Sequence, residues 1–306
     1  MIGARRLAQY APGVQYAALG VFLVAAGALA ATRFSPSDEA VPVSVRPAAS
    51  HPAAFFDDRQ FAQSLALAEA APAEPMTDAR AVIIPHHWVG GHLILGALRD
   101  LAAAGTYDRI ILVGPNHTNA GGAPITTSDL AWETPFGVVS PDPQGLAALP
   151  GDVPVSVAPD VLTYEHSIAG IVPAVAYYLP GAAVLPLVFD ASISPNEVER
   201  LAAALAGLMD ERTILIAAVD FSHYLPAEQA RLRDAESLDA LSGVEASRVM
   251  TFGNEHMDSP ASIALVMEVV QRLGATEFHL LENADSSEVT GGFSGSVTSY
   301  VSGYYR

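Results

Sequence analysis

The sequence contains no cysteine and no lysine. Without cysteine the chain can form no disulfide, no thiolate nucleophile, no cysteine-ligated zinc site and no iron–sulfur cluster. Without lysine it has no Schiff-base amine and no phosphate-binding loop of the lysine-containing kind. The missing disulfides do not decide between a reducing and an oxidising compartment.

Basic residues are also scarce. The 306 residues include 15 basic side chains, all arginine, against 33 acidic ones, and the formal net charge is −18. The acids are spread along the chain and would repel a phosphate backbone, so we predict no nucleic-acid partner. A hydrophobic content of 51% excludes disorder for the bulk of the chain, and the length fits one domain of about 250 residues with appendages.

The longest uncharged stretch lies near the N-terminus. Arg5 and Arg6 precede an apolar run over residues 11–32, which is about the length that crosses the hydrocarbon layer as a helix. We therefore expect residues 1–33 to be a signal anchor or a signal peptide. The anchor predicts a single-pass protein of the cell membrane with its domain outside the cytoplasm, because the arginines stay inside. Cleavage near Ala28-Leu29-Ala30 would instead give a periplasmic or secreted protein.

The rest of the chain reads as a linker over residues 34–43 and one domain over residues 44–306. Four continuous apolar runs in the domain predict strands that are buried on both faces, as in mainly parallel sheets. Helical patterns alternate with them, and a further strand is expected near 277–281. We expect an α/β fold, with a central largely parallel or mixed sheet flanked by helices. The predicted strands are 81–84, 109–113, 183–189 and 213–219, and the predicted helices are 92–104, 167–178, 195–209 and 259–273.

Three of the four strands run directly into a histidine, namely His86, His117 and His223. Ligands of open α/β sheets bind beyond the carboxyl ends of the strands, so these side chains should converge there. A lone histidine at a strand end is usually structural, but three equivalent placements favour a metal site. Imidazole suits iron, zinc, copper and nickel, and two or three histidines with a carboxylate form a common catalytic arrangement.

Carboxylates occur close to these histidines. Asp220 precedes His223 by three residues, Glu165 adjoins His166, and Glu255, His256 and Asp258 share one loop. We expect Asp220 to orient the imidazoles, although it could equally cap a turn. Glu165 could be a solvated acid at a helix N-terminus.

A series of short motifs in order resembles the Memo-like family, also called AmmeMemoRadiSam system protein B, which is related to class III extradiol dioxygenases. The segment from Val45-Arg-Pro to Phe55-Phe56-Asp57 resembles the family's opening, and Tyr300-Val-Ser-Gly-Tyr304 resembles its closing strand. The histidine motifs are Ile84-Pro-His86, Leu112-Val-Gly-Pro-Asn-His117, Tyr164-Glu-His-Ser-Ile168 and Val219-Asp-Phe-Ser-His-Tyr224.

The resemblance implies a class III extradiol dioxygenase-like architecture. It also implies that His86, His117 and His223 hold a divalent metal ion, with iron expected and zinc or copper as alternatives. His166 would line the same cleft. We expect His166 to be the acid–base group, because imidazole titrates near working pH, and we group Asp220 with it as a catalytic residue. The family does not supply a reaction.

Two departures from the family pattern stand out. The family commonly has a cysteine–glycine pair ahead of a proline-led helix, and here the segment Asn254–Pro260 places His256 at that position. His87 also competes with His86 as a ligand, although the position after proline favours His86.

Two functions follow as hypotheses. The first is a metal-dependent oxygenase or redox enzyme that acts on a small molecule. The second is a non-catalytic metal-binding or adaptor domain, displayed outside the membrane, that uses the same cleft to recognise a protein partner.

Overall fold

The computed structural model describes residues 49–292 and 295–306. The predicted membrane or signal segment, residues 1–33, and the predicted linker, residues 34–43, lie outside the described residues, as do the first residues of the predicted domain. Within the part that is described, no helix is both long enough and apolar enough to cross a membrane.

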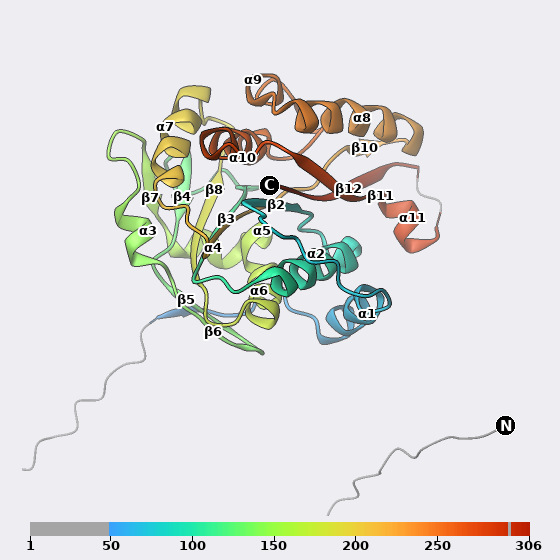
Figure 1. The fold of residues 1–306 in the computed structure, drawn as a ribbon, viewed down its shortest axis with the longest axis horizontal. Coiled ribbons are helices and arrows are strands. Elements are labelled where there is room, and N and C mark those ends of the chain that lie inside the picture. The colour runs from blue at the N-terminus through green and yellow to red at the C-terminus, as the bar shows by residue number, and fades with distance from the viewer. Residues whose placement is uncertain (1–48, 293–294) are drawn as a thin grey trace, which may run out of the picture. The chain divides into compact units, whose positions relative to one another are not determined.

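A mixed sheet of nine strands forms the centre of the described residues (Figure 1). Four parallel strands occupy its middle, in the order β2, β9, β3, β8. β12 pairs antiparallel with β2 on one side, and β4 pairs antiparallel with β8 on the other. The strands are β2 (Ala81–Ile84), β3 (Arg109–Pro115), β4 (Ile125–Thr127), β7 (Val155–Val157), β8 (Ala183–Phe189), β9 (Thr213–Ala218), β10 (His223–Leu225), β11 (Phe278–Asp285) and β12 (Val297–Tyr305).

The predicted sheet is confirmed, because all four apolar runs form its parallel centre. Alternate residues of each strand enter opposite cores: Ala81 and Ile83 pack into one, and Val82 and Ile84 into the other. Side chains alternate between the faces of a strand, so a strand covered on both faces must be apolar at every position. That requirement explains the continuous runs in the sequence.

Helices cover both faces of the sheet (Figure 1). The core on one face contains residues of α1 (Asp58–Ala68), α2 (Gly91–Ala104), α4 (Pro159–Tyr164), α5 (His166–Ala169) and α6 (Val172–Tyr178). The core on the other face contains residues of α7 (Pro195–Ala206), α8 (Ala227–Gly243), α9 (Ala246–Val249) and α10 (Pro260–Leu273). The fold is therefore a three-layer α/β arrangement.

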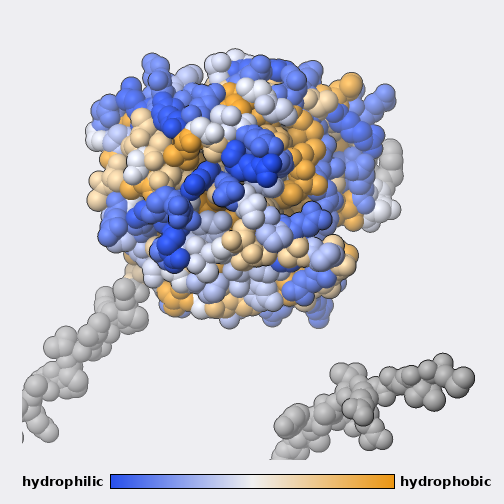
Figure 2. All heavy atoms as spheres, viewed as in Figure 1, coloured by the Kyte–Doolittle hydropathy of each residue, from blue (hydrophilic) through white to orange (hydrophobic). Residues whose placement is uncertain are grey.

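Hydrophilic and hydrophobic residues are interspersed over the face of the molecule seen in Figure 2. Several of the most exposed large hydrophobic side chains, Leu67, Val138 and Leu232, lie far apart in the sequence, on α1, β6 (Gly137–Val139) and α8. Scattered exposed apolar residues are normal for a globular protein. These residues therefore do not indicate a partner surface.

The main differences between the prediction and the structure concern helices. The helix predicted over 167–178 is divided, because α5 ends at Ala169 and α6 begins at Val172. The helix predicted over 195–209 ends at Ala206; it begins with a capping box in which Ser194 and Glu197 satisfy each other's backbone N–H groups. α8 was not predicted. The remaining elements are β1 (Ser50–His51), the 3₁₀ turn η1 (Trp88–Gly90), β5 (Ala131–Thr134), α3 (Pro143–Ala147) and α11 (Ser286–Thr290).

Candidate metal centre

The carboxyl ends of the central strands bring the predicted histidines together. His86 follows β2, His117 follows β3, and His223 begins β10 shortly after β9. The rings of His86 and His117 lie 5.1 Å apart, and His87 lies 6.5 Å from His223 and 5.1 Å from His86. Adjacent parallel strands therefore deliver residues from distant parts of the sequence to one place.

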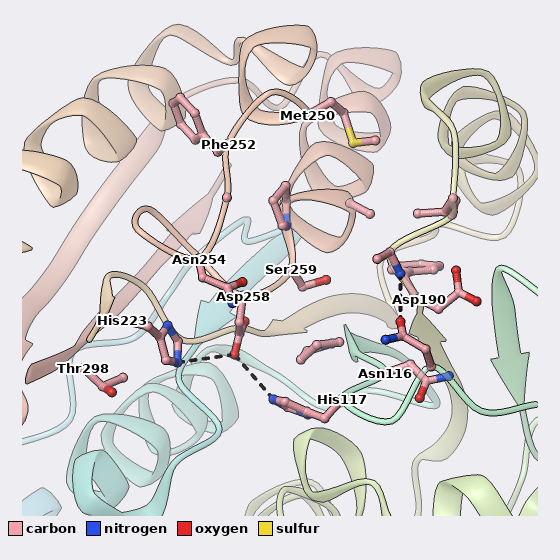
Figure 3. Close-up of a pocket in the computed structure, with 18 of the residues that line it drawn as sticks. Asn116, His117, Asp190, His223, Met250, Phe252, Asn254, Asp258, Ser259 and Thr298 are labelled. Atoms are coloured by element: carbon pink, nitrogen blue, oxygen red, sulfur yellow. Dashed lines mark hydrogen bonds and ion pairs between the residues drawn. The ribbon is translucent and has the colours of Figure 1, made fainter. Parts of the chain in front are cut away.

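Asp258 lies among the three predicted ligands. Its Oδ2 atom is 3.4 Å from Nε2 of His86, 3.7 Å from Nε2 of His117 and 3.9 Å from Nε2 of His223. Figure 3 shows the carboxylate between His223 and His117. The Nε2 atoms of all three histidines therefore face the same carboxylate oxygen.

Backbone hydrogen bonds fix the loop that carries Asp258. The backbone N–H of Asp258 donates to the carbonyl of Asp220 at 3.1 Å, and that of His223 donates to Asn254 at 2.9 Å. Ser259 then caps α10, with Pro260 in its first turn. The carboxylate thus stands at the N-terminus of a 14-residue helix, whose dipole favours negative charge.

The hydrogen bonds of His86 define the role of each ring nitrogen. Nδ1 lies 3.1 Å from the carbonyl oxygen of Ala218. Because a carbonyl can only accept, Nδ1 must carry the proton and donate it. Nε2 of neutral His86 therefore bears a lone pair, and it is buried without a hydrogen-bond partner. A lone pair in that state is suited to bind a metal ion.

Glu165 holds His117 in place. Its Oε2 accepts the backbone N–H of His117 at 2.8 Å, and its Oε1 accepts Nδ1 of the same residue at 2.8 Å. Burial lowers the pKa of His117, but the neighbouring carboxylates Asp258 and Glu165 outweigh it and raise that pKa to about 10. Burial raises the pKa of Glu165, but its hydrogen bonds from His117 and Ser167 outweigh that and lower it to about 2.

The position of Glu165 depends on a close approach between α5 and β3. A Cβ atom on Gly114 would lie 2.9 Å from the Ser167 hydroxyl oxygen. That hydroxyl donates to the carbonyl of Pro115 at 2.9 Å. Glycine at the end of β3 therefore allows the first turn of α5 to sit against the strand. Glu165 caps this turn, as one reading of the sequence proposed, but it is buried and not solvated.

Asp220 is completely buried and serves the first histidine motif. Its carboxylate accepts the backbone N–H of His86 at 2.8 Å and a hydrogen bond from Nδ1 of His87. Burial opposes ionisation of Asp220, but the electrostatic influence of the His86 imidazole and the hydrogen bond from His87 hold its pKa well below the usual range. The same hydrogen bond raises the pKa of His87. Asp220 thus touches the imidazoles and the backbone of this segment.

His166 stacks on His117, with ring centroids 4.2 Å apart, and lies 5.0 Å from His86. Burial and the neighbouring imidazoles lower its pKa to about 4, and burial also lowers the pKa of His223. His166 is therefore neutral near pH 7.

His256 lies apart from these groups, although the sequence placed it at the family's cysteine position. Its Nε2 pairs with Glu236 at 2.7 Å, and its ring stacks on Phe252 at 4.0 Å. Asp258, two residues later, is the side chain of this loop that reaches the histidines. The sequence contained one signal for it: an acid directly before the helix predicted over 259–273.

A cavity of about 780 Å³ adjoins the histidines. His87, His117, His166 and His223 line one part of it, and Phe189, Ile193, Met250 and Phe252 line another. Among the described residues that line it there is no arginine. Tyr224 also contributes, and its positive φ of 59° turns the chain sharply after His223. A cavity of this size suits a small organic molecule.

Several combinations of these side chains could hold a metal ion in the described part of the chain. In each group the candidate ligand atoms lie within 4.8 Å of one another. The groups are His86, His117 and Asp258; His86, His87 and His166; His87, Asp220 and His223; and His117, Glu165 and His166.

Comparison with known proteins agrees with the resemblance seen in the sequence. A model of the Memo-like protein family matches residues 53–304. A MEMO1 family protein of Methanosarcina acetivorans is 31% identical over 225 residues, covering 70% of this chain and 82% of the relative. Another from Methanopyrus kandleri is 29% identical over 236 residues, covering 74% and 82%.

A solved structure supports the fold. The crystal structure of an uncharacterized protein from Escherichia coli K12 superimposes with a TM-score of 0.51 and 14% sequence identity. The match covers 74% of this chain and 99% of that one. At this identity the likeness speaks for the α/β architecture alone.

Proposed function

Because the chain belongs to the Memo-like protein family, we propose that it binds a divalent metal ion through His86, His117 and His223. We propose further that it uses this ion in oxygenase or redox chemistry on a small molecule held in the adjoining cavity. Iron is the metal that we expect, since imidazole ligands with open positions are typical of non-haem iron enzymes.

The observation that carries this proposal is the common direction of three imidazole nitrogens. Nε2 of His86, His117 and His223 all lie within 4 Å of one carboxylate oxygen, at 3.4, 3.7 and 3.9 Å. Nε2 of His86 is also buried without a partner, and a buried polar atom without a hydrogen bond is costly. A metal ion would satisfy it.

The surrounding side chains fit such a centre. Glu165 accepts Nδ1 of His117, and the Ala218 carbonyl accepts Nδ1 of His86. Hydrogen bonds of this kind fix the tautomer and direct Nε2 toward the metal. A bound iron(II) ion would supply Lewis acidity and electron transfer to a substrate in the cavity. His166 and Asp220 remain the proposed catalytic residues: His166 lines the cavity, and Asp220 orients His87.

The experiment is metal analysis of the full-length protein purified without oxygen, followed by addition of nitric oxide as a dioxygen mimic. We expect about one metal ion per chain, and an iron–nitrosyl signal in electron paramagnetic resonance from the iron(II) form. An iron-loaded sample without that signal would reject the oxygenase proposal in favour of non-catalytic metal binding. A protein that retains no metal would reject the centre itself.

A further inference from the structure

We propose that Asp258 is a fourth protein ligand of the metal centre, which would then combine three imidazoles with one carboxylate. The inference rests on the proposed metal centre and adds to it a residue that determines which metal is bound.

The side chain of Asp258 is largely buried, and the contacts of its Oδ2 atom are with imidazole nitrogens at 3.4 to 3.9 Å. Only 9% of it is exposed, and both of its carboxylate oxygens are buried without a hydrogen-bond partner in the described residues. Asp234 shows the usual situation: its Oδ1 accepts hydrogen bonds from the hydroxyls of Ser222 at 2.6 Å and Ser299 at 2.7 Å. An ionised carboxylate is not kept out of water without compensation. A cation between the imidazoles would compensate Asp258.

The two acids that contact the histidine segments from the other side, Asp220 and Glu165, are already occupied. Asp220 accepts hydrogen bonds from His86 and His87, and Glu165 accepts them from His117 and Ser167. Both bind ring or backbone N–H groups, which leaves the far side of each imidazole free. Asp258 instead faces the Nε2 atoms on that free side. Its contacts are those of a ligand, whereas theirs orient the ligands.

The backbone around Asp258 does not need the carboxylate. Its N–H is bound by the carbonyl of Asp220, the bridge between Phe221 and Met257 ties the loop to the segment after β9, and the Ser259 side chain caps α10. Aspartate often occurs before helices because its side chain bonds backbone N–H groups. That explanation fails here, because the carboxylate makes no such bond.

A carboxylate ligand changes which metal ions the site prefers. Oxygen ligands suit harder ions such as manganese(II) and iron(II), whereas thiolate ligands select zinc and copper(I). One negative ligand also halves the double positive charge that a divalent ion would bring among neutral imidazoles. We therefore expect a centre that binds manganese(II) and iron(II) well and disfavours copper(I).

The test compares Asp258→Asn with Asp190→Asn by titration of metal-free protein with cobalt(II) and manganese(II). Asp190 is a matched control, because it lines the same cavity but its carboxylate is bound by Ser192. Loss of a direct ligand should exceed the roughly 10- to 100-fold effect of losing an orienting group. We expect D258N to weaken binding by more than about 100-fold and to change the visible cobalt(II) spectrum, and D190N to stay within about twofold.

The outcomes separate the two proposals. Wild-type protein that binds neither ion would remove the metal centre and this inference together. Tight wild-type binding that D258N leaves unchanged would reject Asp258 as a ligand while the histidine centre stands. An equal loss of metal affinity in D190N would show that the effect comes from the negative charge of the cavity. That result would also reject Asp258 as a ligand.

A second variant keeps the test decisive if D258N does not fold. Asp258→Cys replaces the oxygen ligand by a sulfur ligand. We expect this variant to bind zinc at least as well as the wild type and to lose its manganese(II) affinity. Unchanged relative affinities for the two ions would contradict coordination through position 258. Circular dichroism of the metal-free variants checks the fold.

Discussion

Two buried histidines, His51 and His86, differ in one respect that separates a structural residue from a candidate ligand. His51 is 0% exposed and His86 is 1% exposed. Both ring nitrogens of His51 are paired at 2.7 Å, one with Thr163 and one with Ser128. His86 pairs Nδ1, whereas its Nε2 has no hydrogen-bond partner among the described residues. Burial therefore does not identify the site, but an unsatisfied buried nitrogen does.

The surroundings of the two histidines reinforce this contrast. His51 belongs to β1, which pairs with β5 in a small sheet of three strands, and its ring stacks on Trp132 at 4.2 Å. His86 follows a central strand at its carboxyl end. The small sheet buries the ring of His51 with hydrogen bonds to both of its nitrogens. The end of β2 instead leaves Nε2 of His86 without a hydrogen bond, at the place where ligands of α/β proteins bind.

Removal of the proposed ligands should affect metal binding most strongly. The triple variant of His86, His117 and His223 to alanine should retain no stoichiometric metal, because it lacks the three imidazoles whose Nε2 atoms lie within 4 Å of Asp258. His51→Ala should bind metal as the wild type does. It should lose stability, because the buried Ser128 hydroxyl and the partly buried Thr163 hydroxyl each lose a partner. Loss of the buried one costs about 1–3 kcal/mol.

Metal analysis and urea unfolding measure both effects. The triple variant should lose the metal and keep its fold. His51→Ala should keep the metal and lose stability. Stoichiometric metal in the triple variant, with a native circular-dichroism spectrum, would show that these histidines are not the ligands.

The central strands could be predicted from the sequence because burial on both faces demands apolar residues throughout. β2 and β8 have the predicted bounds. α8 could not be predicted, since its buried face includes Asp234 and Ser237 and so lacks the apolar period of an ordinary surface helix. Asp234 is satisfied by hydroxyls from Ser222 and Ser299, which come from other parts of the chain. Such pairing leaves no local signal.

The candidate site was predictable to a similar extent. The strand-end rule indicated His86, His117 and His223 and their convergence. It could not select Asp258, because a carboxylate in a loop carries the same local signal whether it caps, pairs or coordinates. The sequence also could not show whether Glu165 is a solvated acid or the partner of His117. The contact between Glu165 and His117 joins positions 48 residues apart, so no local pattern reveals it.

A smaller effect should come from the group that orients His117. Glu165→Gln preserves the size of the side chain but loses the charge that accepts Nδ1 of His117 and caps α5. We expect metal affinity to fall by about 10- to 100-fold, as is typical when an orienting partner of a metal-bound imidazole is removed. Chelator competition measures the change.

Glu133→Gln is the matched control for Glu165→Gln. Glu133 accepts a hydrogen bond from the Ser50 hydroxyl at 2.6 Å in an exposed position of the small sheet. Its replacement should leave metal affinity unchanged. Equal metal affinities of Glu165→Gln and Glu133→Gln would mean that Glu165 serves only as a helix cap. Only the proposed ligands themselves would then distinguish the histidine site from the small sheet.

The smallest expected effect is the pH dependence contributed by His51. Thr163 donates its hydroxyl proton to the carbonyl of Pro159, so it accepts from Nδ1 of His51. Nε2 must then accept from Ser128. A second ring proton would oppose the Ser128 hydroxyl proton, and burial lowers the pKa of His51, although Asp129 and Asp160 partly oppose this shift.

The sign of this dependence follows from linkage. The unfolded chain takes up a proton at His51 near pH 6.5, but the folded chain does so only at lower pH. The stability that neutral His51 contributes is therefore complete above about pH 6.5 and is lost as pH falls toward the folded pKa, by at most about 1.4 kcal/mol per pH unit. His51→Gln has no titrating ring. The free-energy difference between wild type and H51Q, from urea unfolding of metal-free protein, should thus narrow by up to about 1 kcal/mol between pH 7.5 and pH 5.5. A free-energy difference that does not change with pH would show that the fold does not hold His51 neutral. His51 could then not serve as the structural histidine with which His86 is compared.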